Sequence, residues 1–148
     1  MPAKPAKAPI KNDFVATFQE LRAIFQPYAA KLRVVHDDGT YYYVETRSAS
    51  FRGRPVCFGA VRKGKNYVSF HLMTVYAGQL CAPVEKGSDL AKVAEHGKKT
   101  AGLISAELKK HMQGKSCFNF KRPEPELFQE LAMLTKRGFE GYQQLGWL

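Results

Sequence analysis

Two basic segments, separated by residues 74–106, constrain the fold of this chain more than any other feature of its sequence. Residues 62–73 (RKGKNYVSFHLM) place a glycine-containing turn before a run of β-branched and aromatic residues, which is typical of a hairpin. Residues 107–121 (ELKKHMQGKSCFNFK) change at Gly114 from a charged helical pattern to alternating apolar residues. Glycine adopts the left-handed backbone that ends a helix, so we expect a short helix from Ser105 to Gln113 and then a strand.

The composition restricts the classes of protein to which the chain can belong. Its 148 residues suit one domain, and the apolar fraction of 45% is ordinary for a globular protein. No apolar run approaches the roughly 20 residues that span a bilayer, and the first residues lack the apolar centre of a secretory signal. We therefore predict a cytoplasmic protein whose three cysteines are reduced thiols. The net charge of +10 predicts an anionic partner, such as nucleic acid, a phosphorylated metabolite or an acidic protein.

Amphipathic helices are predicted near both ends of the chain. The first begins at Phe14, because Asn12 or Asp13 can cap the free amide groups of its first turn, and it ends or kinks at Pro27. The last begins at a pair of prolines, since the amide that proline lacks would be unpaired in a first turn anyway. Its inner face is expected to carry Leu127, Leu131, Leu134 and Phe139.

Two hairpins are predicted between these helices. An Asp-Gly turn joins residues 33–36 to residues 41–46, and a second turn joins residues 56–62 to residues 67–76. With the strand that follows Gly114, these segments give an antiparallel sheet of about five strands. We therefore predict an α+β fold in which the sheet is covered by the N- and C-terminal helices.

The strand predicted over residues 67–76 has an apolar face and a polar face. Side chains alternate across a strand, so Val68, Phe70 and Leu72 are expected in the core and the residues between them on the opposite face. If this strand pairs with the strand of the second segment, basic and amide side chains surround the polar face. The candidate ligand-binding residues are Arg62, Lys65, Tyr67, Ser69, His71, Met73, Asn119 and Lys121.

The competing interpretation of this face is a solvated surface, in which His71 is a half-exposed sheet residue and the lysines maintain solubility. His111, on the lysine-rich short helix, is likewise expected at the surface. The sequence has no G-x-S-x-G motif and no aspartate beside His71 to complete a triad, and its Gly-Lys-Ser run leads from helix to strand, the reverse of a phosphate loop. We therefore predict a protein that is not an enzyme and that has no cofactor.

The two basic segments resemble those of the YdhG-like domain-of-unknown-function family, and the resemblance extends from about Phe14 to Tyr142. It implies a small α+β domain whose architecture is similar to that of frataxins. Relative to that family, residues 78–99 look like an insertion, which we expect to be flexible. The predicted organisation is thus a disordered basic arm over residues 1–12, followed by a single domain over residues 13–148.

The resemblance also implies an alternative function, intracellular iron binding and delivery, because an iron-carrying role has been suggested for part of the family. Iron would need carboxylate ligands, for which Asp37 and Asp38 are the candidates. The charge balance opposes this alternative, since the first helix and first hairpin hold only scattered acids in a basic protein. These acids are Asp13, Glu20, Asp37, Asp38 and Glu45.

The function predicted from the sequence is a non-enzymatic binding or chaperone-like module that captures an anionic small ligand or an acidic partner. Single-stranded nucleic acid is a second alternative, because Tyr41, Tyr43 and Tyr67 lie among basic residues of the predicted sheet. Such strands bind to surfaces that combine base stacking with phosphate contacts.

Overall fold

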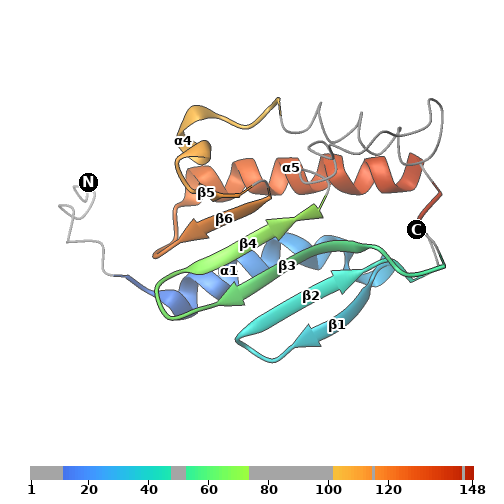
Figure 1. Cartoon of the computed structure of the whole chain (residues 1–148), viewed down its shortest axis with the longest axis horizontal. Helices are drawn as coiled ribbons and strands as arrows, with labels where there is room; N and C mark the ends of the chain where they lie inside the picture. The colour runs from blue at the N-terminus through green and yellow to red at the C-terminus, as the bar shows by residue number, and fades with distance from the viewer. Residues whose placement is uncertain (1–11, 48–52, 74–101, 115, 145) are drawn as a thin grey trace, which may run out of the picture.

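The computed structural model of the chain describes residues 12–47, 53–73, 102–114, 116–144 and 146–148. The arm predicted over residues 1–12 falls outside these ranges except for its last residue, and the predicted insertion at about 78–99 falls outside them entirely. The described residues form the predicted α+β fold, with an antiparallel sheet and helices from the N- and C-terminal parts of the chain (Figure 1).

In the described part of the chain, six strands form one antiparallel sheet in the order β1-β2-β3-β4-β6-β5. Strands β4 and β6 come from the two basic segments, which therefore lie side by side. The strands are β1 (Arg33–Asp37), β2 (Tyr41–Glu45), β3 (Cys57–Lys63), β4 (Val68–Leu72), β5 (Met112–Gln113) and β6 (Cys117–Phe120). The helices are α1 (Phe14–Phe25), the 3-10 helix η1 (Gln26–Lys31), α4 (Ala106–Lys109) and α5 (Pro125–Gln144).

Helices α1 and α5 lie on the same face of the sheet, behind it in Figure 1. Helix α1 begins where the sequence predicts, because Oδ1 of Asp13 accepts a hydrogen bond from the amide of Ala16 at 3.0 Å. Phe18, Leu21 and Phe25 of this helix are buried in the core. The two helices thus cover the apolar face of the sheet, and we call the opposite face the open face.

The alternation predicted for β4 is confirmed. Val68, Phe70 and Leu72 are fully buried, whereas Ser69 and His71 are only partly buried and lie on the open face. A strand alternates in this way because successive side chains point to opposite sides of the sheet. The polar side chains of the two basic segments therefore share one surface.

The strand register aligns the side chains of the open face in rows that cross the sheet. Each row joins residues that are register partners on neighbouring strands, and adjacent strands lie about 4.8 Å apart. The first row is Tyr41, Arg62, Ser69 and Asn119. The second row is His36, Tyr43, Ala60, His71 and Cys117.

Two element boundaries differ from the sequence prediction. Strand β4 ends at Leu72, and Met73 already has helical backbone, so Met73 does not continue the alternation. The predicted short helix begins with its Ser105 cap but ends at Lys109. Met112 and Gln113 instead form β5, because pairing with β6 satisfies the backbone groups at this edge of the sheet.

The ring of Phe25 occupies the centre of the core. It stacks on Phe70 with ring centroids 4.9 Å apart, and its edge meets the ring of Phe58. It also covers Gly59 of β3: a Cβ atom at this glycine would lie 2.4 Å from Cζ of Phe25 and 2.8 Å from the carbonyl oxygen of His71. The approach of α1 to the sheet therefore requires glycine at position 59.

Replacing Gly59 with alanine should destabilise the fold by about 1–3 kcal/mol, because the methyl group would collide with Phe25 and with the backbone of the neighbouring strand. Urea unfolding of Gly59→Ala would measure this loss. The double variant Gly59→Ala/Phe25→Leu should show a smaller added cost for the alanine, since the ring is gone. An unchanged midpoint for Gly59→Ala would contradict the close packing described.

Candidate functional site

A pocket of about 280 Å³ lies at the turn between β3 and β4, on the first row of the open face. It collects four of the residues predicted as a ligand site, and Gly64 and Asn66 complete its wall. The lining residues are Arg62, Gly64, Lys65, Asn66, Tyr67 and Ser69. The sequence prediction of a basic site beside this strand therefore corresponds to a hollow in the structure.

The turn that forms the pocket is closed by backbone hydrogen bonds. The amide of Gly64 donates to the carbonyl of Tyr67 at 2.9 Å, and the amide of Lys63 donates to the carbonyl of Thr40 at 2.7 Å. These bonds hold the β3–β4 turn against the β1–β2 turn. Arg62 and Lys65 are exposed at the pocket, and none of its lining residues is acidic.

The polar floor of the pocket is a hydrogen-bonded network that reaches across β4, β6 and β5. Ser69 donates through Oγ to Oδ1 of Asn119 at 2.7 Å, and Asn119 donates through Nδ2 to Oε1 of Gln113 at 2.7 Å. The same Oε1 atom accepts the phenolic hydrogen of Tyr67 at 3.0 Å. The hydroxyl groups of Tyr67 and Ser69 thus use their hydrogens inside the network.

This network decides which groups can hold an anion. A hydroxyl whose hydrogen is already donated offers only lone pairs to a ligand, and lone pairs repel an anion. The positive charges at the pocket belong to Arg62 and Lys65, which are both exposed, and the guanidinium of Arg62 lies against an aromatic ring. Tyr67 and Ser69, predicted as ligand contacts, are therefore better suited to accept a hydrogen bond from a ligand than to donate one.

Arg62 connects the pocket to an aromatic group on the neighbouring strands. Its guanidinium carbon lies 5.3 Å from the ring centroid of Tyr41, which is its partner in the first row. Tyr41 in turn lies beside His36 and Tyr43, with ring centroids 4.9 and 6.1 Å away. The cation is thereby held on the open face between the aromatic side chains and the pocket.

His71 lies in the second row and is not part of the pocket lining. Its Nδ1 atom is 2.9 Å from Oγ of Ser116 and 3.5 Å from Sγ of Cys117. Burial lowers the pKa of His71 below its ordinary value, so the imidazole is neutral at pH 7. A neutral ring does not supply the positive charge that activates a neighbouring thiol.

Met73 and Lys121 also lie apart from the pocket lining. Met73 follows the end of β4, and Lys121 follows the end of β6, where its carbonyl accepts the amide hydrogen of Asp13 at 3.0 Å. The structure therefore brings together Arg62, Lys65 and the network beneath them. Of the other predicted residues, His71 lies on the same face but outside the hollow.

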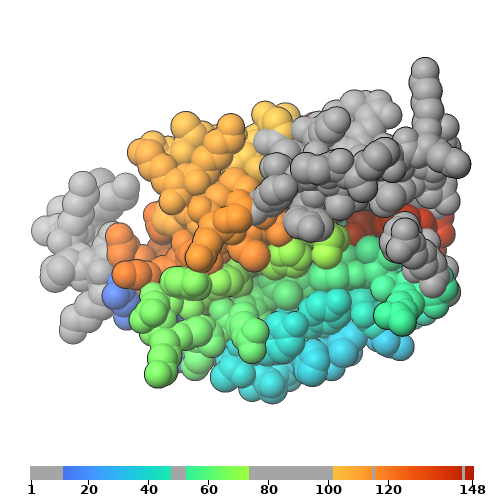
Figure 2. Space-filling view, in the orientation of Figure 1, coloured from blue at the N-terminus to red at the C-terminus, as the bar shows by residue number. Residues whose placement is uncertain are grey.

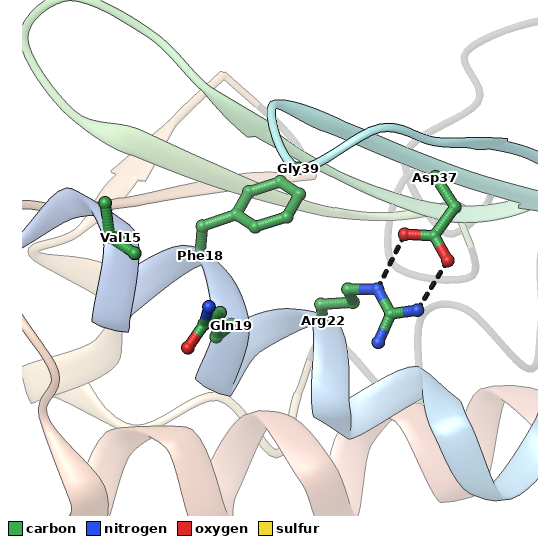
Figure 3. A pocket seen from close by; sticks show the side chains of 6 residues that line it. All are labelled: Val15, Phe18, Gln19, Arg22, Asp37 and Gly39. Atoms are coloured by element: carbon green, nitrogen blue, oxygen red, sulfur yellow. Dashed lines mark hydrogen bonds and ion pairs between the residues drawn. The ribbon is translucent and has the colours of Figure 1, made fainter.

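A second pocket, of about 410 Å³, lies between α1 and the β1–β2 hairpin. Figure 3 shows Val15 and Phe18 along one side of it and an ion pair at the other end. In that pair, Nε and Nη2 of Arg22 donate to the two carboxylate oxygens of Asp37 at 2.8 and 2.5 Å. These hydrogen bonds lower the pKa of Asp37 below its ordinary value.

Asp37 and Asp38, the candidate iron ligands, both have partners within the protein. Asp37 binds Arg22, while Oδ1 of Asp38 accepts hydrogen bonds from the amides of Thr40 and Tyr41 at 2.9 Å. Among the residues that the structure describes, no group of three or more His, Cys, Asp or Glu side chains is placed to hold a metal ion. Iron delivery stays a prediction from the sequence resemblance.

His111 has a structural role that the sequence analysis missed. It lies half-buried between α4 and β5, where Nδ1 is 2.9 Å from the carbonyl oxygen of Asn119 and the ring stacks on Phe120 at 4.5 Å. Its Nε2 atom lies 3.4 Å from Oε2 of Glu124. The expectation that His111 lies on the helix is wrong, because the helix ends at Lys109, and the ring is half-buried at the surface rather than fully exposed.

The two described cysteines, Cys57 and Cys117, are free thiols, and Cys81 lies outside the described residues. Burial raises the pKa of Cys57 to about 11, so this thiol stays protonated at pH 7. A hydrogen bond joins it to Tyr43, whose pKa burial also raises. Cys57 therefore packs as a small, largely apolar side chain.

His71 should make the stability of the protein depend on pH. The unfolded chain binds a proton near the ordinary pKa of 6.5, but the folded chain binds it only at lower pH, so folding stability falls as the pH drops below about 6.5. Urea unfolding at pH 8 and pH 5.5 should show that the free energy of unfolding falls more between these two pH values in the wild type than in His71→Gln. The other histidines are present in both proteins, so equal losses would contradict the buried, neutral state of His71.

Comparisons with protein-family models, with curated proteins and with solved structures gave no match to this chain. The resemblance to the YdhG-like family thus stays a prediction from two sequence segments, while the α+β architecture is shown by the structure itself. Within the described ranges, no helix has the length and apolar character needed to cross a membrane.

Proposed function

We propose that this protein is a binding module that captures a phosphate-like anion in the pocket between β3 and β4. The observation that carries the proposal is the pairing of Arg62 and Lys65 at one hollow whose lining contains no carboxylate. A concave surface lined by one sign of charge concentrates counter-ions. The hairpin places both cations at the same opening, which a scattered basic surface would not do.

The charge at this pocket is not neutralised by neighbours. Among the described residues, the arginines Arg22 and Arg33 have carboxylate partners in Asp37 and Glu45, but Arg62 packs on Tyr41 and has no such partner. An arginine that is held on an aromatic ring and lacks a carboxylate retains donors for an oxyanion. Lys65 adds a flexible ammonium group on the adjacent turn.

The size of the pocket limits what can fill it. Its volume of about 280 Å³ lies just below the roughly 300–1,000 Å³ typical of sites that enclose a drug-sized ligand. A phosphate group, or the phosphate end of a larger molecule, suits such a hollow better than a whole large ligand. We therefore expect the anion to be a phosphate group, with the remainder of the ligand outside the pocket.

Inorganic pyrophosphate is a suitable probe, because it presents phosphate oxygens without any other recognition group. Replacing Arg62 or Lys65 with glutamine should each weaken pyrophosphate binding about fivefold to tenfold, since each removes an exposed charge-assisted hydrogen bond. Calorimetric or NMR titration of the wild type and the two variants would measure the change. Binding should also weaken as salt is added.

The matched control is Lys136→Gln on α5, which changes the net charge equally but lies on the helix that packs against the opposite face of the sheet. It should leave pyrophosphate affinity within about twofold of the wild type. If Lys136→Gln weakens binding as much as Lys65→Gln, the protein attracts anions only through its net charge. That outcome would overturn the assignment of the pocket.

A further inference from the structure

The aromatic side chains beside the pocket form a second recognition surface. His36, Tyr41 and Tyr43 come from β1 and β2 and gather on the open face, with ring centroids between 4.9 and 6.4 Å apart. We call these three residues the aromatic platform. His36 is exposed and both tyrosines are partly exposed, so the platform presents ring surface to solvent rather than to the core. Figure 2 shows β1, β2 and the β3–β4 hairpin (cyan and green) as one continuous exposed surface.

Arg62 is shared by the platform and the pocket. It lines the pocket, and its guanidinium lies 5.3 Å from the ring centroid of Tyr41, a cation–π geometry. Guanidinium planes and aromatic rings are the two kinds of surface on which nucleobases stack. Tyr41 and Arg62 lie on neighbouring strands, so a ligand that joins a flat ring to a phosphate could contact the platform and the pocket at the same time.

Two of the three acids nearest the platform are paired with arginines, and the third, Asp38, keeps its negative charge at the β1–β2 turn because hydrogen bonds from that turn lower its pKa. Glu45 lies two residues after Tyr43 on β2, and it forms an ion pair with Arg33. Asp37 forms the bidentate pair with Arg22, and the Asp38 carboxylate is held by the amide hydrogens of its own turn. The positive charge available to a ligand at the junction of platform and pocket is that of Arg62 and Lys65, and the charged carboxylate of Asp38 lies on the His36 side of the platform.

We propose that the ligand of this surface is a nucleotide, whose phosphate lies at Arg62 and Lys65 and whose base stacks on the aromatic platform beside Tyr41. The inference rests on the proposed capture of a phosphate-like anion and specifies its chemical class. The lone pairs of Tyr67 and Ser69, left free by the network, can accept hydrogen bonds from the sugar hydroxyl groups. A free nucleotide and a nucleotide within a single strand offer the same chemistry, and the test below separates them.

The test compares ribose 5-phosphate with adenosine 5′-monophosphate, which differ by the base alone. Stacking of one base on an aromatic side chain strengthens binding, so the nucleotide should bind about tenfold tighter than the sugar phosphate. Tyr41→Leu should abolish this tenfold difference, and any weakening that it causes at Arg62 should affect the sugar phosphate and the nucleotide equally. Tyr41→Phe keeps the ring and should preserve the difference, while thermal unfolding of both variants verifies that they fold.

If ribose 5-phosphate binds through Arg62 and the nucleotide binds no tighter, the platform does not recognise a base, and this inference is overturned while the anion site stands. If neither compound binds, the anion site fails as well. Short single strands of RNA and DNA identify the source: tighter binding than the mononucleotide, lost in Tyr41→Leu, assigns the site to nucleic acid, and no gain assigns it to free nucleotides.

Discussion

The contact between Phe25 and Gly59 determines how the rest of the molecule is arranged. The ring lies so close to β3 that no Cβ atom can be accommodated there, and it stacks on Phe70 of β4. Helix α1 is thereby fixed against the two central strands, with α5 beside it on the same face. Both helices pack on the apolar face. The polar side chains of the open face therefore lie on a surface that α1 and α5 do not cover. The candidate site is a consequence of this one-sided packing.

Sequence periodicity predicted the layers well because burial and alternation are local properties. Val68, Phe70 and Leu72 are buried as expected, and the alternating apolar residues of β6, Phe118 and Phe120, are buried too. The end of α4 could not be predicted in this way. Lys109 to Gln113 have residues that suit a helix, but Met112 and Gln113 gain strand partners in β6 that only the folded sheet supplies. His111 was misplaced for the same reason, since its contacts with Asn119 and Glu124 depend on where the helix stops.

The sequence predicted which face of the sheet carries the candidate site, but it did not predict where on that face the pocket lies. Alternation places Ser69 and His71 on the same face, yet one lies at the pocket and the other contacts Ser116 and Cys117 in the next row. The difference arises from the β3–β4 turn, whose backbone shapes the hollow next to Ser69. The sequence also did not predict to which acceptors the hydroxyl groups of Tyr67 and Ser69 donate their hydrogens. The choice of acceptor depends on Gln113, whose side chain accepts from Tyr67 across strands that are distant in sequence.

A net charge of +10 does not by itself make a binding site, and the distribution of acids explains why one pocket differs from the remaining surface. Arg22 of α1 is paired with Asp37 of β1, and Arg33 of β1 is paired with Glu45 of β2, so the charge of each arginine is neutralised within the fold. Arg62 instead lies against an aromatic ring, and a ring leaves the guanidinium its positive charge and most of its donors. The partner of an arginine thus decides whether it stabilises the fold or remains available. On the open face, the ring of Tyr41 keeps Arg62 available at the edge of the pocket, and the same ring gives that edge its capacity to stack.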